Sequence, residues 1–251
     1  MSDETRNYIR DIVWKLLLRE PGDTSYLAFV RDACLDEGEV DIFTLNHDTL
    51  METFLAQHGI ELCDGFTKPV NEVRYFDRAQ FDSCNSVRFV KLHGSLSWFE
   101  FDQDDRLVAG IPLGSDVLHR KDPAGSDQVT LRGRPLILAG TGNKPLEYQV
   151  GVFGELHHQF YRRIRETRHL AVVGYGFGDR GINQRVFDWI FGSHEARMVI
   201  AHPNPEGLKS QGRWEVREYW DGLEARGKIR FIVRAAEELT WNEIRAEFDD
   251  N

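Results

Sequence analysis

Apolar residues along the chain follow two patterns, one with the period of a helix and one typical of buried strands. At residues 5–19 and 146–166, apolar side chains recur every three or four positions, which indicates amphipathic helices. Short apolar and β-branched runs, such as 40–44 and 169–173, indicate strands that are buried on both faces. The predicted helices are residues 5–19, 25–36, 49–58, 146–166, 183–191, 206–226 and 235–248, and the predicted strands are 40–44, 88–92, 135–139, 169–173, 197–201 and 228–233.

This alternation predicts an α/β fold, in which a doubly wound, mostly parallel, Rossmann-like sheet carries helices on both faces. We expect a single domain over residues 1–251, with loop or hairpin insertions at about 60–87 and 97–134, where the sequence is polar and rich in turn residues. In the second insertion, Trp98–Phe101 predicts one arm of a β-hairpin that turns near Asp102–Asp105. Such folds form their sites in the loops at the carboxyl ends of parallel strands.

Composition and charge narrow the classes of function. The chain carries 31 Lys and Arg against 41 Asp and Glu, a formal net charge of −10, which gives no reason to expect nucleic acid as a partner. No apolar run approaches the roughly 20 residues of a membrane span, and the acidic start, Met1–Glu4, is unlike a secretory signal. Three cysteines without a C-x-x-C pair favour a reducing, cytoplasmic compartment and argue against a four-thiolate zinc site.

The histidines offer no metal-ligand spacing. His157 and His158 are adjacent, so on a helix they point about 100° apart and cannot chelate one ion together. The H-E-x-x-H pattern is absent as well. The sequence therefore predicts no metal site.

Two polar clusters follow predicted strands. Thr44-Leu45-Asn46-His47-Asp48 lies where a strand meets a helix, a place suited to binding oxygens or anions, although Asn46 or Asp48 could simply cap that helix. Lys91-Leu92-His93-Gly94-Ser95 follows the next predicted strand of this kind. His93 suits proton transfer near neutral pH, and Gly94 would leave room for a ligand beside the imidazole; a structural histidine bonded to a loop carbonyl is the alternative.

Two further clusters are rich in glycine. Small residues at Gly140-Thr141-Gly142 would let backbone amides approach a phosphate or ribose, but the segment lacks the Walker A spacing and a plain turn explains it equally well. Gly174-Tyr175-Gly176-Phe177-Gly178-Asp179 resembles a dinucleotide fingerprint only weakly, because Asp179 stands where the third glycine is required.

Taken in order, these four clusters resemble the sirtuin-like family, and its zinc-free prokaryotic branch, linked to NAD+ hydrolysis in anti-phage defence, more than its deacetylases. Residues 43–50 are similar to the family's T-x-N-x-D segment, 90–95 to its K-L-H-G-S segment and 172–179 to its G-Y-[SG]-x-x-D segment. Gly140–Gly142 falls where the family has a ribose-contacting loop. The resemblance extends from about residue 40 to about residue 205.

The resemblance implies a catalytic role for three residues. Asn46 would orient a water or contact the nicotinamide ribose, Asp48 would hold the nicotinamide end, and His93 would act as general base toward a ribose hydroxyl or the attacking water. The remaining residues that the resemblance assigns to binding NAD+ are Thr44, Gly94, Gly140, Thr141, Gly142, Gly174, Tyr175, Gly176 and Phe177.

The chain departs from the family pattern in two ways. Its cysteines, Cys34, Cys63 and Cys84, cannot form the four-cysteine zinc ribbon of sirtuin deacetylases, which favours plain NAD+ hydrolysis over recognition of an acyl-lysine peptide. In addition, the glycine-rich strand-loop that opens the family and cradles the diphosphate is expected to be absent, since a helix precedes the first glycine, Gly22.

These observations lead to one function and two alternatives. We expect an NAD+ hydrolase that uses NAD+ as substrate, needs no cofactor or zinc, and works as a homo-oligomer or in a complex with a regulatory or sensor subunit. The first alternative is a catalytically inactive sirtuin-like subunit that binds a nucleotide or serves as a scaffold. The second is another nucleotide or nucleoside hydrolase on the same sheet.

Overall fold

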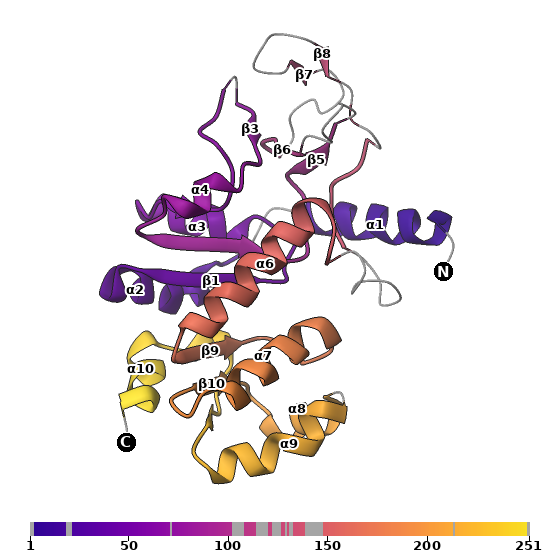
Figure 1. Cartoon of the computed structure of the whole chain (residues 1–251). Helices are drawn as coiled ribbons and strands as arrows, with labels where there is room; N and C mark the ends of the chain where they lie inside the picture. The colour runs from indigo at the N-terminus through magenta and orange to yellow at the C-terminus, as the bar shows by residue number, and fades with distance from the viewer. Residues whose placement is uncertain are drawn as a thin grey trace. The chain divides into compact units, whose positions relative to one another are not determined.

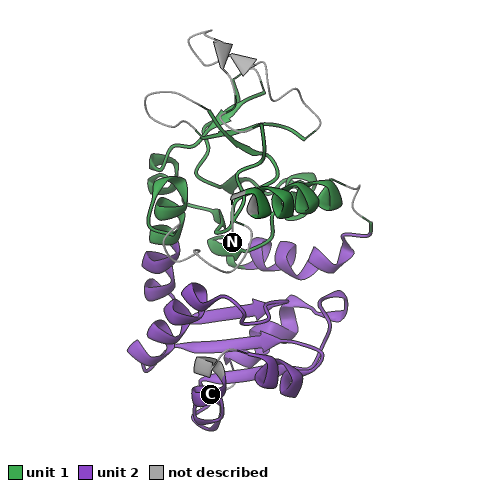
Figure 2. Cartoon of the chain, turned by 90° about the vertical axis from the view of Figure 1, so that its right-hand side faces the viewer, with its two compact units in different colours: residues 1–22, 37–159 green, residues 23–36, 160–251 purple. Residues whose placement is uncertain are grey.

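The computed structural model describes residues 3–18, 22–70, 72–101, 108–113, 120–121, 127–128, 130, 133–138, 148–212 and 214–249. The chain forms two compact units (Figure 2). Unit 1 consists of residues 1–22 and 37–159, and unit 2 of residues 23–36 and 160–251. Each unit is built on its own three-stranded parallel sheet.

In unit 1 the sheet has the order β1-β4-β2, and its strand β1 is labelled in Figure 1. Its strands are β1 (Val40–Thr44), β4 (Val87–Lys91) and β2 (Leu62–Cys63). Every residue of the central strand β4 is buried, as expected for a strand that has a neighbour on each side and is covered on both faces. The helices of this unit are α1 (Asp3–Leu17), α3 (Leu50–Gln57), α4 (Ala79–Asp82) and the first part of α6 (Gly151–Glu166).

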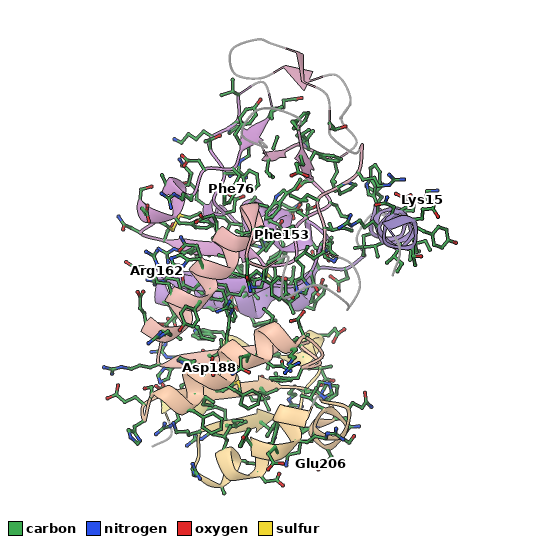
Figure 3. The ribbon with its side chains drawn as sticks, turned by 45° about the vertical axis from the view of Figure 1, so that its right-hand side comes forward. Lys15, Phe76, Phe153, Arg162, Asp188 and Glu206 are labelled. Carbon is green, nitrogen blue, oxygen red and sulfur yellow. A yellow bond between two sulfur atoms is a disulfide. The ribbon has the colours of Figure 1, made fainter. Side chains whose placement is uncertain are left out.

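A second, antiparallel sheet completes unit 1. It has the order β3-β6-β5, from β3 (Arg74–Tyr75), β6 (Val108–Gly110) and β5 (Trp98–Glu100), and a separate pair is formed by β7 (Arg120–Lys121) and β8 (Asp127–Gln128). The helix α1 packs on this sheet through Trp14, whose ring meets Phe99 edge-on with 6.4 Å between centroids. The opposite side of α1 is exposed, as Lys15 in Figure 3 illustrates.

In unit 2 the parallel sheet has the order β11-β10-β9. Its strands are β9 (His169–Val173), β10 (Arg197–Ala201) and β11 (Ile229–Ile232). The helices are α2 (Ala28–Glu37), α7 (Arg180–Gly192), α8 (Pro205–Gln211), α9 (Trp214–Ala225) and α10 (Trp241–Asp249), with short 3-10 turns at Ser25–Leu27 and Ala236–Glu238. The buried core joins β10 and β11 to α10 through Val199, Ile232 and Ile244.

The α/β class predicted from the sequence is confirmed: parallel strands alternate with helices, and the strands at 40–44, 169–173 and 197–201 begin and end as predicted. The burial expected on both faces was wrong for β9, whose residues are half-buried or exposed because it is an edge strand of its sheet, and β1, also an edge strand, is only half-buried. The hairpin arm at Trp98–Phe101 is also confirmed, because β5 pairs antiparallel with β6. The helix predicted at 206–226 is interrupted at Gly212, which separates α8 from α9. The single-domain boundaries remain a prediction.

The prediction of a strand at 135–139 was wrong for its described residues. Only an isolated antiparallel bridge joins Ile137 to Gly94. The segment instead bonds to the turn that follows β4, since Leu136 O accepts from Ser95 N at 3.2 Å and Leu138 N donates to His93 O at 2.9 Å. Ile137 and Leu138 are buried, so the apolar run correctly predicted burial but not strand pairing.

The region expected as an insertion at 60–87 supplies a strand of the parallel sheet. Its β2 lies beside β4, with Cys63 opposite Arg88. Cys63 is also bonded to Cys84 in a disulfide, which an odd and sparse set of cysteines had not indicated. The pairing arises because β2 and the chain entering β4 are neighbours in the sheet although 21 residues separate the two cysteines.

The carboxyl end of β4 is joined to the loop after β1 by a buried cation. Lys91 is 2% exposed, and its Nζ donates to the carbonyl oxygen of Asp48 and, at 2.7 Å, to Glu52 Oε1 on the first turn of α3. Burial of the Glu52 carboxyl, which is 23% exposed, raises its pKa above 4.5, and the nearby Lys91 ammonium lowers the pKa in part. A buried charge of this kind must keep its partner.

We expect Lys91→Met to lower the free energy of unfolding by about 3 kcal/mol, because the change leaves Glu52 without its cation. Urea denaturation measures this. The double variant Lys91→Met, Glu52→Met removes both charges and should regain most of the loss. Lys209→Met is the matched control, since Lys209 is paired with Asp221 and Glu224 on the surface and its loss should cost about 1 kcal/mol at most. If Lys91→Met and Lys209→Met lowered the free energy of unfolding equally, the assignment of Lys91 as a buried, paired cation would be contradicted.

The raised pKa of Glu52 has a consequence for stability against pH. Between 4.5 and the higher pKa of the folded state, the folded chain holds the proton more tightly than the unfolded chain does. The contribution of Glu52 to the free energy of unfolding therefore falls as pH rises through that window, and Glu52→Gln should abolish this fall. Denaturation at a series of pH values measures the slope.

Glu243→Gln is the control with the opposite sign. The side-chain hydrogen bond from Thr240 lowers the pKa of Glu243, so its contribution is present above 4.5 and is lost as pH falls through its folded pKa. If Glu52→Gln showed the same dependence of the free energy of unfolding on pH as the wild-type protein, the buried position of the Glu52 carboxyl would be wrong.

Candidate functional site

The parallel pairing of β1 and β4 brings two of the predicted clusters together in unit 1. Thr44 lies opposite Lys91 in the register, so the two strands end at the same edge. Two backbone hydrogen bonds continue the contact past the strands, from Leu92 N to Thr44 O and from Leu96 N to His47 O, both at 2.9 Å. The segment 44–48 and the segment 92–96 are therefore neighbours, as predicted for loops at the carboxyl ends of parallel strands.

The loop after β1 is shaped by its own short polar side chains. Thr44 Oγ1 accepts from Asn46 N at 3.1 Å, and Asp48 Oδ1 accepts from Leu50 N at 3.1 Å, just ahead of α3. Asp48 thus accepts from the first residue of this helix, but the residue in the capping position is Thr49, whose side chain makes no cap bond, so the expected cap at Asn46 or Asp48 is not found. Asn46 is exposed, and its side chain makes no hydrogen bond to another described residue, so its carboxamide is available to a ligand.

His93 lies directly after β4 and is buried, with 5% of its surface exposed. Its Nε2 is 3.0 Å from Tyr148 Oη, and its ring centroid is 6.2 Å from that of His47. Polar ring atoms from two neighbouring strand ends therefore lie close to each other. A buried imidazole, with an exposed carboxamide on the neighbouring loop, is a suitable arrangement for moving a proton from a bound hydroxyl or water.

Gly94 is required by a close backbone approach. Its φ is +83°, and a Cβ at this position would lie 2.1 Å from Leu136 O. The space beside this glycine is therefore filled by the chain at 136–137, which explains the residue without a ligand. Its predicted role in binding NAD+ remains a prediction, as does that of Thr44, whose hydroxyl is bonded to Asn46 N.

The fourth cluster lies in unit 2, at the carboxyl end of β9. Phe177 has a φ of +50°, is fully buried and meets Trp220 edge-on, with 5.4 Å between ring centroids. Tyr175 Oη donates to Asn183 Oδ1 at 2.7 Å. Asp179 caps α7, accepting from Gly181 N at 3.0 Å. These bonds fold the loop tightly, and its glycines, such as Gly176, have open space where a Cβ would lie.

The remaining predicted site residues, Gly140, Thr141 and Gly142, lie outside the described residues. The structure thus brings Thr44, Asn46, Asp48, His93 and Gly94 together in unit 1, and places Gly174, Tyr175, Gly176 and Phe177 in unit 2. Among the described residues, no group of three or more His, Cys, Asp or Glu side chains could hold a metal ion. No helix in the described part of the chain is long and apolar enough to cross a membrane.

Four residues around this site were not selected from the sequence. Lys91 had been quoted within its motif but given no role, although a lysine inside a buried strand run is itself an unusual signal. Glu52, Tyr148 and His157 carry no motif, and only the packing reveals them. Of these, Tyr148 and His157 contact the neighbourhood of His93 directly.

Comparison with known proteins gives the family. No curated protein matches the chain. A solved structure described as a mutant Sir2 homologue in complex with ADP-ribose matches with a TM-score of 0.50 and 12% sequence identity, covering 97% of this chain and 74% of that one. At this identity the likeness shows the fold. The family model of the SIR2-like domain matches residues 40–221, which include the strand ends described above. The chain therefore belongs to the SIR2-like domain family.

Proposed function

We propose that this chain hydrolyses NAD+ at the bond between nicotinamide and ribose, releasing nicotinamide and ADP-ribose. The observation that carries the proposal is the pairing of β1 with β4, which makes the exposed Asn46, Asp48 and the buried His93 neighbours within the matched SIR2-like segment. ADP-ribose, one of the expected products, is the ligand of the structurally similar Sir2 homologue.

The chemistry asks little of the protein. In NAD+ the leaving group is already cationic, so the bond between ribose C1′ and the ring nitrogen breaks with its electron pair passing to nicotinamide, which leaves neutral. Water then bonds to C1′ and gives up a proton. Asn46 would orient that water, Asp48 would hold the nicotinamide end, and His93 would accept the proton.

The charges around the site are compatible with this reaction. Positive charge grows on the ribose in the transition state, so a neutral amide and a carboxylate are suitable neighbours. Lys91, whose ammonium bonds to this loop at the carbonyl of Asp48, is paired with Glu52. Glu52 thus offsets a charge that would otherwise oppose the reaction.

We propose further that the enzyme acts within an assembly, either with copies of itself or with a regulatory or sensor subunit, and that it depletes NAD+ in bacterial anti-phage defence. The support is the likeness of its motifs to the zinc-free prokaryotic sirtuin-like branch. One observation favours the alternative of an inactive binding subunit. His93 is only 5% exposed, so a substrate would have to reach an imidazole that other residues cover.

Substitution of Asn46 or His93 tests the proposal. We expect Asn46→Ala and His93→Ala each to lower NAD+ hydrolysis at least about a hundredfold, because each removes a group that handles the attacking water. Chromatography of nicotinamide and ADP-ribose measures turnover, with the chain alone and with any co-purifying subunit.

Matched controls are Asn242→Ala and His194→Ala, two exposed positions in unit 2 that should stay within about twofold of wild type. Full activity in Asn46→Ala or His93→Ala would overturn the site assignment. Calorimetry separates the alternative: heat of binding for NAD+ and ADP-ribose without any turnover would identify a binding subunit rather than an enzyme.

A further inference from the structure

The imidazole of His93 is held by one buried tyrosine. Tyr148 Oη lies 3.0 Å from His93 Nε2, and the two rings are nearly parallel, at 16° with 6.0 Å between centroids. Both side chains are only 5% exposed. A hydroxyl in this position can donate to a ring nitrogen or accept from one, so it can keep its bond to His93 before and after the imidazole takes up a proton.

Tyr148 is itself held in place by a stacked histidine ring. Its ring stacks on His157 of α6, with 3.8 Å between centroids and 20° between planes. His157 is fully buried, and its Nε2 lies 3.2 Å from the carbonyl oxygen of Leu92, the residue before His93. The contacts therefore run from Leu92 through His157 and Tyr148 to His93, and they begin and end on consecutive residues of the same strand end.

This closed set of contacts has a specific consequence for a histidine base. A hydroxyl can meet Nε2 in either tautomer of a neutral imidazole, so its contribution is to the direction of the ring. A partner that is stacked and buried cannot turn away easily, so it holds the ring in one direction. The hydroxyl of a mobile or exposed residue would not do so.

We propose that Tyr148 is a positioning residue for His93, fixing the orientation of the imidazole that the proposed NAD+ hydrolysis requires. The inference rests on that proposed function. His157 serves the same end one step further away, since it holds the tyrosine ring through the stack and is anchored on the Leu92 carbonyl.

Tyr148→Phe removes the hydroxyl and keeps the stacked ring. We expect kcat for NAD+ hydrolysis to fall about tenfold to a hundredfold while KM stays within about twofold, because the lost group orients a base and does not bind substrate. Nitrogen-15 NMR of the histidine rings gives a second readout: the Nε2 signal of His93 should show a hydrogen bond in the wild-type protein and its loss in the variant.

The matched control is Tyr161→Phe, which removes a hydroxyl bonded to Arg165 in unit 2 and should change neither readout. If Tyr148→Phe does not fold, His157→Phe keeps the stack, removes the bond to Leu92, and should lower kcat by a smaller factor with a smaller change in the Nε2 signal of His93.

Two results would overturn the inference. One is an unchanged kcat together with an unchanged Nε2 signal of His93. The other is a rise in kcat, which would mean that Tyr148 blocks His93 and must leave it. Absence of NAD+ hydrolysis in the wild-type protein would instead refute the proposed function, and the NMR readout would still decide whether Tyr148 orients His93.

Discussion

Parallel pairing of β1 with β4 is the constraint on which the candidate site depends. In a parallel pair both strands end at the same edge, and here Thr44 and Lys91 are partners at that edge. The backbone then holds the following residues together, through Leu92 N on Thr44 O and Leu96 N on His47 O. A shift of register by one residue would turn the side chains of β4 to the other face and separate these two loops.

The buried ammonium of Lys91 makes this arrangement rigid. Removed from water, it must be met by oxygens, and it finds them on Asp48 and Glu52. The bond to a backbone carbonyl fixes the course of the loop whatever side chain Asp48 carries. The same bonds place the loop of Asn46 beside His93 and leave the Asn46 carboxamide exposed, so the features that stabilise the edge are also those that prepare it for a ligand.

Within the motifs of this chain, some residues are explained by the fold and others are not. In the loop after β9, Asp179 caps α7 and Phe177 fills the core beneath Trp220, so both have complete structural explanations. Gly94 is likewise required by the Leu136 carbonyl. By contrast, packing gives no reason for an exposed Asn46, and packing alone does not call for an imidazole at His93. These two positions therefore carry the functional argument.

Much of this protein can be derived from local pattern alone, because hydrophobic periodicity is the direct imprint of a buried face. Strands at 40–44, 169–173 and 197–201, the hairpin arm at Trp98 and the α/β class were all predictable for that reason. Which buried segments pair is another matter. The run at 135–138 is as apolar as a strand but bonds to a turn, β2 joins the sheet from a polar region, and Cys63 meets Cys84. Tyr148 bonds to His93, and His157 to the adjacent Leu92, from more than 50 residues away along the chain. Such contacts depend on the distances between elements after folding, and no spacing along the chain encodes them.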